Sequence, residues 1–211
     1  MAQGPADGQP GTDRREQLLR SALEVIVSRG YADTRIADVA EHAGTSPALV
    51  IYYFKTRDQL LTEALRYSED AWYAAGTQRL AAIDTAVGRL TELIAMTCLP
   101  DTHPAARTEW LLWLDLWALS PRNPGVAAVR RKFDERWRQT ISATVLAGQE
   151  SGEFAASADA DEFAVTLSAL LDGMAVQIAV EDPDIPPRRA YDLAMRYAAG
   201  QLGFPWDPPA C

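Results

Sequence analysis

Residues 109–119 read EWLLWLDLWAL, so three tryptophans and two carboxylates lie within eleven consecutive positions. Indole faces attract cations through the ring quadrupole, and a nearby carboxylate balances the bound charge. This combination could form a cage for a positively charged ligand. The same bulky side chains could instead fill the core of a helical protein, in which case they would bind no ligand.

Helical geometry separates the two carboxylates of this segment. At about 100° per residue, Trp110, Trp113 and Trp117 lie within about 60° of one another. Glu109 lies at the edge of that face, whereas Asp115 points to nearly the opposite side. The helix is apolar nearly all round, which is typical of a helix buried on all sides. We therefore expect two distinct faces, a tryptophan wall and a lone carboxylate that needs a partner.

Other chemistries have little support in the sequence. The two histidines and two cysteines form no metal-ligand spacing or disulfide framework, and no nucleophile motif or phosphate-binding glycine loop occurs. We therefore expect no metal, no cofactor and no enzymatic activity. The cysteine usage indicates a reduced, cytoplasmic protein. No apolar run reaches the length of about 18 residues that a membrane span requires.

The net charge of −9 is unevenly distributed along the chain. Residues 1–66 contain 8 Lys and Arg against 9 Asp and Glu (8 − 9 = −1), and residues 67–211 contain 12 against 20 (12 − 20 = −8). Because the acidity lies in the second part, a small N-terminal module can still present a locally positive face to nucleic acid.

The hydrophobic pattern is helical throughout, without sustained alternation of period two, and it predicts an all-α protein of about nine helices. Asp13 and Glu16 have the spacing of a capping box at the start of the first helix. Breakers and capping residues divide the chain. The expected helices span residues 13–30, 36–43, 47–53, 57–82, 85–99, 104–119, 122–150, 160–180 and 187–202.

Residues 36–55, IADVAEHAGTSPALVIYYFK, have the pattern of two short helices joined by a tight turn. Gly44 permits the left-handed backbone of that turn, Ser46 can cap the second helix, and Pro47 suits its first position. Small or branched side chains would hold the two helices together: Val39, Ala40, Ala43 and Val50. The pattern indicates a helix-turn-helix whose second helix lies in the major groove of DNA. A plain αα-hairpin uses the same turn.

The N-terminal 66 residues resemble the TetR family of bacterial one-component regulators. The matching segment is RSALEVIVSRGYADTRIADVAEHAGTSPALVIYYFKTRDQLL. It contains a first helix ending in Gly-Tyr, the helix-turn-helix, an aromatic cluster ending in Phe, and the start of a long fourth helix. The resemblance implies a homodimer that binds operator DNA with two recognition helices and binds a small-molecule effector in its C-terminal half.

On this basis we divide the chain into four parts. We expect a disordered tail at 1–12, a three-helix DNA-binding domain at 13–56, an effector-binding and dimerisation domain at 57–203, and a loose C-terminal tail at 204–211. The long helix at 57–82 links both halves and would act as the lever between them. The charged run RRKFDERWR at 130–138 is expected to be a solvated helix face.

The resemblance also implies which residues contact DNA. Phosphate contacts would come from Thr34, Arg35, Tyr52, Tyr53, Lys55 and Arg57. Base-facing positions would be Thr45, Ser46, Pro47 and Ala48. The family often carries tyrosine at the position of Ile51 and lysine at that of Pro47, so this recognition helix has few side chains for bidentate readout. We therefore expect affinity to depend on phosphate contacts, DNA shape and salt.

The last two helices carry broad apolar stripes, which the resemblance assigns to a four-helix dimer interface. Its residues would be Phe163, Leu167, Leu170, Met174, Tyr191, Met195 and Leu202. Packing within one subunit is the alternative explanation of the same stripes. Asp172 stands inside the apolar run, where a carboxylate must be paired or face a ligand.

The effector site is expected at Trp110, Trp113, Trp117, Glu109, Asp115 and Asp172. The C-terminal half is similar to regulators of choline-like or polyamine cations in two segments, EWLLWLDLW and LLDGMAVQ. This similarity favours a cationic amine. An apolar effector, such as a drug, an acyl chain or an aromatic metabolite, would suit a pocket lined by Trp, Leu and Met equally well.

These observations predict a ligand-responsive transcriptional repressor that a small-molecule effector releases from a palindromic operator. An activator with the same architecture is the first alternative. A helical enzyme or carrier with an incidental helix-turn-helix is the second, and the lack of a catalytic constellation counts against it.

Overall fold

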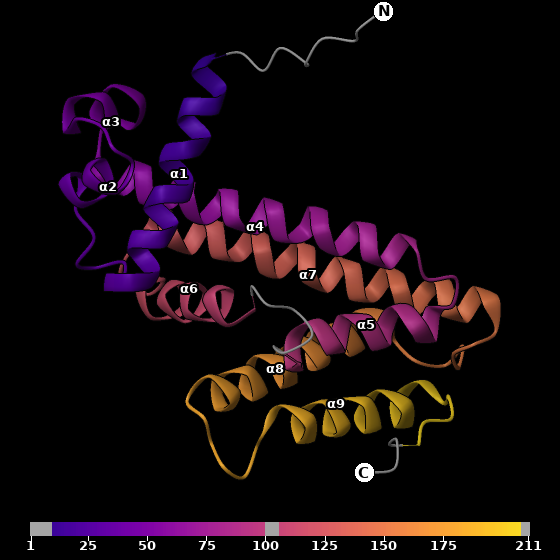
Figure 1. The fold of residues 1–211 in the computed structure, drawn as a ribbon. Coiled ribbons are helices and arrows are strands. Elements are labelled where there is room, and N and C mark those ends of the chain that lie inside the picture. Colours follow the sequence, from indigo (N-terminus) through magenta and orange to yellow (C-terminus); the bar gives the residue numbers. More distant parts are fainter. Residues whose placement is uncertain (1–9, 100–105, 208–211) are drawn as a thin grey trace, which may run out of the picture.

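The computed structural model describes residues 10–99 and 106–207, with the backbone alone at 10–12 and 106–111. Within these ranges the chain is all-α, as predicted (Figure 1). The helices are α1 (Pro10–Arg29), α2 (Ile36–His42), α3 (Pro47–Phe54), α4 (Arg57–Ala81), α5 (Ala86–Cys98), α6 (Ala106–Leu119), α7 (Pro124–Ser151), α8 (Ala160–Ala179) and α9 (Pro187–Leu202).

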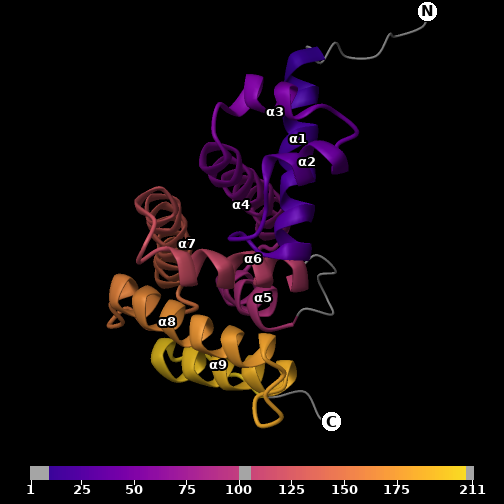
Figure 2. The same ribbon diagram turned by 90° about the vertical axis from the view of Figure 1, so that its left-hand side faces the viewer.

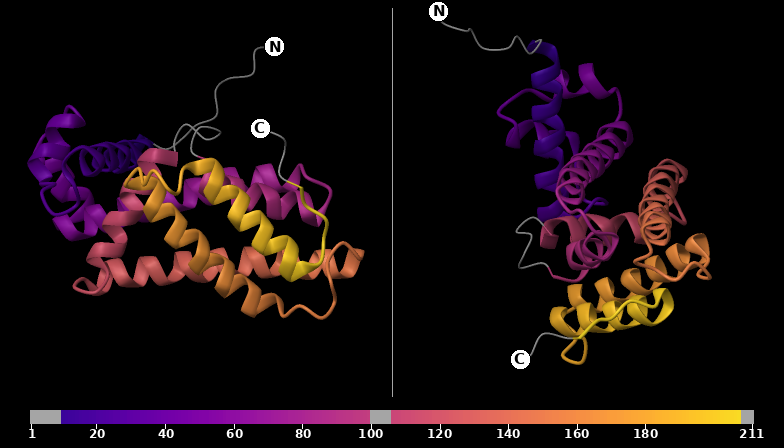
Figure 3. Two further views of the ribbon diagram at one scale, coloured as in Figure 1. Left: turned by 90° about the horizontal axis from the view of Figure 1, so that it is seen from below. Right: turned by 90° about the vertical axis from the view of Figure 1, so that its right-hand side faces the viewer.

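The first three helices form a small group at one end of the long helix α4 (Figure 1). Helices α4 and α7 run side by side along the length of the molecule, and α8 and α9 lie together across the opposite side (Figure 2). Helix α5 packs against α7, α8 and α9 (Figure 3). Helix α6 contacts α1, α7 and α8, so it lies between the N-terminal helices and the rest of the chain.

Side-chain caps explain where several helices begin. The Ser46 hydroxyl accepts a hydrogen bond from the Leu49 N–H at 3.3 Å, and Thr56 caps α4 through the Gln59 N–H at 3.1 Å. Asp159 caps α8 through the Asp161 and Glu162 amides. The predicted start of α1 is wrong, because the helix begins at Pro10 and Asp13 lies within its first turn. The predicted tail therefore does not reach residue 12, and residues 1–9 lie outside the described residues.

The buried apolar side chains form two clusters. The N-terminal core surrounds Leu18, Ile26, Val50 and Phe54 of the first three helices. It continues beyond residue 56 to Leu60, Leu61, Ala64 and Leu65 of α4, Leu112 and Leu116 of α6, and Val126 of α7. The C-terminal core is formed by α5, α7, α8 and α9, with Ile94, Ile141, Leu167 and Leu171 at less than 2% exposure. Helix α6 thus belongs to the N-terminal core although it follows α5 in the chain.

Part of the predicted dimer interface lies inside this C-terminal core. Four of the residues are buried within their own chain: Phe163, Leu167, Met195 and Leu202. The prediction that they face a partner is wrong, since side chains this covered have no surface left for one. Leu170, Met174 and Tyr191 remain partly exposed.

The predicted loose C-terminal tail is wrong for the part that is described. Phe204 is buried with its ring centroid 5.4 Å from that of Phe154, and Trp206 packs against the same core. Residues 208–211 lie outside the described residues.

Helix α8 is long and apolar enough to cross a membrane by length and composition alone. It instead packs against α7 and α9, and its buried face forms part of the C-terminal core. Only 39% of this apolar stretch is buried, so α8 also presents apolar side chains on its outer face.

Candidate DNA-binding face and effector pocket

The turn between α2 and α3 has the predicted construction. Gly44 adopts a φ of 60°, in the left-handed region that its lack of a side chain permits. The four residues expected to hold the helices together, Val39, Ala40, Ala43 and Val50, are all buried. These apolar contacts fix α3 against α2 and leave its opposite face free.

The outer face of α3 is exposed and carries most of the predicted DNA contacts. Ser46, Pro47 and Ala48 are exposed, and Thr45 is partly buried. Tyr52 is 68% exposed. Ile51 is 46% exposed and presents an apolar side chain on this face. Such a face can contact thymine methyl groups and DNA backbone, but it has few donors for base edges.

Lys55 and Tyr53 complete this face at the end of α3. The Lys55 ammonium donates a hydrogen bond to the Tyr52 carbonyl at 2.8 Å and lies 5.3 Å from the centre of the Tyr52 ring. Tyr53 is partly buried. Lys55 and Arg35 are exposed and make no ion pair among the described residues, unlike Arg29, which pairs with Asp38 at 2.9 Å.

One predicted phosphate contact, Thr34, is wrong, and a second residue of that set, Arg57, is engaged within the molecule. The Thr34 side chain is fully buried, and its hydroxyl donates to the Gly30 carbonyl at 2.8 Å. Arg57 donates hydrogen bonds to the carbonyls of Tyr31, Ala32 and Thr34. The guanidinium therefore holds the turn between α1 and α2, where it also lies over the Tyr31 ring at 5.3 Å.

Asp115 binds this same turn from helix α6. Its Oδ2 accepts a hydrogen bond from the Tyr31 N–H at 3.0 Å. The lone carboxylate has therefore found the partner that its sequence context required. Asp115 does not line the pocket described below, so its predicted role in effector binding is wrong. The turn between α1 and α2 is instead held from both α4 and α6.

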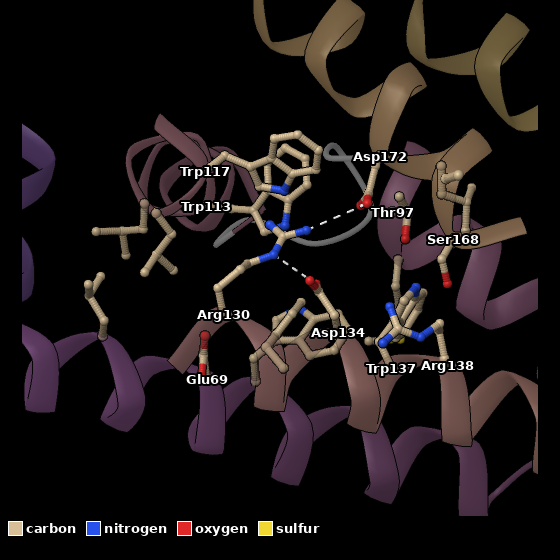
Figure 4. A pocket seen from close by; sticks show the side chains of 18 of the residues that line it. Glu69, Thr97, Trp113, Trp117, Arg130, Asp134, Trp137, Arg138, Ser168 and Asp172 are labelled. Atoms are coloured by element: carbon tan, nitrogen blue, oxygen red, sulfur yellow. Dashed lines mark ion pairs between the residues drawn. The ribbon is translucent and has the colours of Figure 1, made fainter. Parts of the chain in front are cut away.

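A pocket of about 270 Å³ lies between α4, α5, α6, α7 and α8 (Figure 4). Its aromatic wall consists of Trp72, Trp113, Trp117, Phe133 and Trp137. Its ionisable groups are Glu69, Arg130, Asp134, Arg138 and Asp172. Pockets that combine an apolar wall with a few convergent polar groups are typical ligand sites.

Arg130 lies at the centre of this pocket and is only 7% exposed. Its guanidinium carbon is 4.9 Å from the ring centre of Trp113 and 4.8 Å from that of Trp117. Nε lies 2.8 Å from an Asp134 oxygen and Nη2 lies 3.6 Å from an Asp172 oxygen (Figure 4). Two indoles and two carboxylates therefore surround one guanidinium.

Two carboxyl groups of the pocket bind protons more tightly than usual. Burial is the main cause that raises the pKa of Glu69 to about 8, and the Asp70 and Asp134 carboxylates raise it further while Arg130 and Arg66 oppose them. Burial likewise raises the pKa of Asp172 to about 6, against the attraction of Arg130. Glu69 is therefore largely neutral at pH 7, and its buried Oε1 has no hydrogen-bond partner in the described part of the chain. Among the described residues, no cluster of three or more His, Cys, Asp or Glu side chains could hold a metal ion.

The structure brings together three of the six predicted effector residues: Trp113, Trp117 and Asp172. The side chains of Trp110 and Glu109 lie outside the described residues, although both positions belong to α6. Asp172 is paired and lines the pocket, as its place in an apolar run required.

Arg130, Asp134 and Trp137 line the pocket although the sequence pattern of RRKFDERWR predicts a solvated helix face. That interpretation is correct for Arg131, Lys132, Glu135 and Arg136, which are exposed. The pattern that indicates the shared face of the pocket residues is the i,i+4 charge pair of Arg130 and Asp134, followed three residues later by Trp137. Glu69 and Trp72 of α4 also line the pocket.

Comparison with known proteins finds matches to both parts of the chain. Residues 18–64 match the sequence model for bacterial regulatory proteins of the TetR family, and residues 86–203 match that for the C-terminal part of BetI-type transcriptional repressors. The HTH-type transcriptional regulator BetI of Burkholderia mallei is 30% identical over 188 residues, covering 87% of this chain and 91% of the relative.

Two solved structures extend the comparison to the fold. A transcriptional regulator from Saccharomonospora viridis in complex with choline is 31% identical, with a TM-score of 0.82 over 90% of this chain and 98% of the other. A TetR-family regulator from Rhodococcus sp. is 28% identical, with a TM-score of 0.77 over 90% of this chain and 99% of the other.

Proposed function

This chain belongs to the TetR family of bacterial transcriptional regulators, and from that premise we propose that it is a repressor whose effector is a choline-like quaternary ammonium cation. The family consists of regulators that bind DNA and small-molecule effectors rather than of enzymes. The proposal concerns which effector this chain binds, through which residues it acts on DNA, and how the two sites communicate.

The observation that supports a cationic effector is the chemistry of the pocket wall. A quaternary ammonium group has no N–H to donate, so it is recognised by aromatic faces and by carboxylates rather than by hydrogen-bond acceptors. The pocket contains four tryptophans together with the carboxylates of Asp134 and Asp172. The choline complex of the similar Saccharomonospora viridis regulator supports the same ligand class.

For DNA we propose that the exposed face of α3 enters the major groove. Base contacts would come from Thr45, Ser46, Pro47 and Ala48, and phosphate contacts from Arg35, Tyr52, Tyr53 and Lys55. Thr34 and Arg57 are removed from this set because their polar groups are used inside the molecule.

The active form would be a cytoplasmic homodimer, since a palindromic operator presents two half-sites. The partly exposed residues of the last two helices, Leu170, Met174 and Tyr191, would contribute to its interface. Two recognition helices must lie about 34–36 Å apart, or a multiple of this, to meet successive major grooves.

Helix α6 would carry the signal between the sites. Trp113 and Trp117 face the pocket from this helix, and Asp115 on its other side holds the turn that precedes α2. A ligand that binds better to one position of α6 than to another would change the position of α2 and α3.

Isothermal titration calorimetry tests the effector class. We expect choline to bind the dimer and 3,3-dimethylbutan-1-ol, its neutral isostere with carbon in place of nitrogen, to bind at least tenfold more weakly, because a desolvated cation–π contact contributes about 2 kcal/mol. A gel shift with DNA upstream of the gene should show a complex that choline dissociates. Equal affinity for the two compounds would refute a cationic effector and favour the apolar alternative, and binding of neither would refute a choline-like effector.

A further inference from the structure

We propose that Arg130 is an internal competitor of the effector: its guanidinium occupies the cation cage formed by Trp113, Trp117, Asp134 and Asp172, and a cationic effector must displace it. This inference rests on the proposed function, because it concerns the same pocket. It adds to that function that Arg130 lowers the affinity for the effector and that effector binding displaces its guanidinium from the cage.

The first support is that the cage around Arg130 is complete. Both indole rings lie within 5 Å of the guanidinium carbon, and carboxylates from α7 and α8 approach two of its nitrogens. These are the groups that would recognise a quaternary ammonium ion. Two cations cannot share the same ring faces, so a ligand that uses Trp113 and Trp117 excludes the guanidinium.

The second support is that Arg130 is incompletely satisfied in this cage. Its Nη1 is buried and has no hydrogen-bond partner among the described residues, and its contact with Asp172 is long at 3.6 Å. A buried donor without a partner is unfavourable. The arginine is therefore held less firmly than the number of its neighbours suggests.

The third support is an acceptor that could receive the displaced group. Glu69 faces the same pocket from α4 (Figure 4), and its buried Oε1 has no hydrogen-bond partner among the residues that the structure describes. A guanidinium leaving the tryptophans can donate a hydrogen bond to this carboxyl oxygen inside the pocket. Arg130 would then exchange contacts with α6 and α8 for a contact with α4, the helix that continues from the DNA-binding module.

The test is choline binding to Arg130→Met, measured by calorimetry. Methionine keeps an unbranched apolar chain but removes the competing cation. We expect choline to bind about tenfold more tightly than to the wild type, with a smaller change for 3,3-dimethylbutan-1-ol, because the gain concerns the cation. Arg130→Lys keeps a cation in place and should remain near the wild type.

Arg138→Met is the matched control. Arg138 lines the same pocket and carries the same charge, but it makes no ion pair or ring contact among the described residues. If the Arg138 variant gains as much choline affinity as the Arg130 variant, the gain comes from removing any positive charge from the pocket, and the inference is overturned. Binding of choline to the wild type without any gain in Arg130→Met overturns the inference and leaves the proposed function standing.

A measurement on the wild type remains available if Arg130→Met does not fold. The Nε–H resonance of Arg130, assigned by its loss in Arg130→Lys, should be shifted upfield by the two indole rings. Saturating choline should move it to the position of a guanidinium away from aromatic rings. A resonance that stays in place at saturation overturns the inference, and absence of choline binding to the wild type overturns the proposed function together with it.

Discussion

The DNA-binding module and the effector pocket are built on opposite principles. The DNA-binding module, residues 13–56, is a contiguous stretch with an apolar core that α4, α6 and α7 complete, and several of its polar groups cap helices or hold a turn. The pocket gathers charged and aromatic side chains from four helices and leaves some of them buried without a partner. The packing and capping of the first region hold its helices in one defined arrangement. The second retains unsatisfied groups, as expected of a site that exchanges partners.

The two regions nevertheless share a wall. Leu65, Leu112 and Leu116 belong to the N-terminal core and also line the pocket. Packed side chains transmit displacements because protein interiors are dense. The contrast between a rigid module and a pocket that exchanges partners can therefore be tested by changing one region and measuring both.

The largest effect is expected for Phe54→Ala in the module. Phe54 is 1% exposed, and truncating a buried phenylalanine costs about 3–5 kcal/mol. Urea unfolding followed by circular dichroism and by tryptophan fluorescence measures the loss. All six tryptophans lie beyond residue 66, so fluorescence reports the pocket side.

Because the core is shared, both probes should show one common transition in Phe54→Ala. Separate transitions would mean that the two regions unfold independently. Tyr52→Ala, on the exposed face of the same helix, is the control and should change stability by less than about 0.5 kcal/mol.

The next largest effect concerns the pH dependence of stability set by Glu69. Its pKa is raised in the folded protein to about 8, from an ordinary value of 4.5, so the native state binds the proton more tightly than the unfolded state. This stabilisation is complete below about pH 4.5 and is lost as the pH rises to 8. Glu69→Gln should reduce the decline, leaving the part due to Asp172, and should be more stable than the wild type at pH 8 by about 2–4 kcal/mol.

Chemical denaturation at pH 5 and pH 8 checks this prediction. Glu150→Gln removes an exposed carboxylate on α7. It should leave the difference in unfolding free energy between pH 5 and pH 8 the same as in the wild type. If Glu69→Gln shows the same decline as the wild type, Glu69 is not protonated in the folded pocket.

A smaller effect is expected for Asp115→Ala at the junction between the regions. The change leaves the Tyr31 N–H without its acceptor, at a cost of about 1–3 kcal/mol. Choline binding should persist, because Asp115 does not line the pocket. Release of operator DNA by choline should be weakened.

Fluorescence anisotropy of labelled operator against choline concentration measures this coupling. Asp84→Ala removes an exposed acid away from the junction and is the control. A release curve identical to that of the wild type would show that the signal does not pass through Asp115.

The smallest effect is expected for Lys55→Ala on the outer face of α3. Loss of one phosphate contact should weaken operator binding by about 1 kcal/mol for all sequences and reduce the salt slope by about 1. A salt titration of the binding constant measures both quantities. Lys132→Ala changes the other lysine of the chain, which is exposed on α7, and should have no effect. Equal affinities for wild type and Lys55→Ala would refute the phosphate contact.

The same contrast explains what could be predicted from sequence. The helix-turn-helix depends on local determinants, so its geometry is predictable: the turn residues Gly44 and Ser46 and the small or branched residues Val39, Ala40, Ala43 and Val50. The faces of α6 were also predictable, since helical periodicity alone separates Trp113 and Trp117 from Asp115.

The pocket depends instead on which helices meet. The pairing of Arg130 with Trp113 and Trp117 joins α7 to α6, and no local pattern specifies that encounter. The burial of Phe163 and Met195 could not be separated from dimerisation for a similar reason, because an apolar stripe does not state what covers it.

Helix α6 lines the pocket and also packs in the N-terminal core, and this determines where the pocket can be re-engineered. Substitutions at Leu112 or Leu116 would change ligand preference and the packing of the DNA-binding core together. Val165 and Ala169 line the pocket from α8, are exposed, and belong to neither core. A biosensor for a bulkier or smaller ammonium compound is therefore best sought in libraries at these two positions, where selectivity can change while the response mechanism is inherited intact.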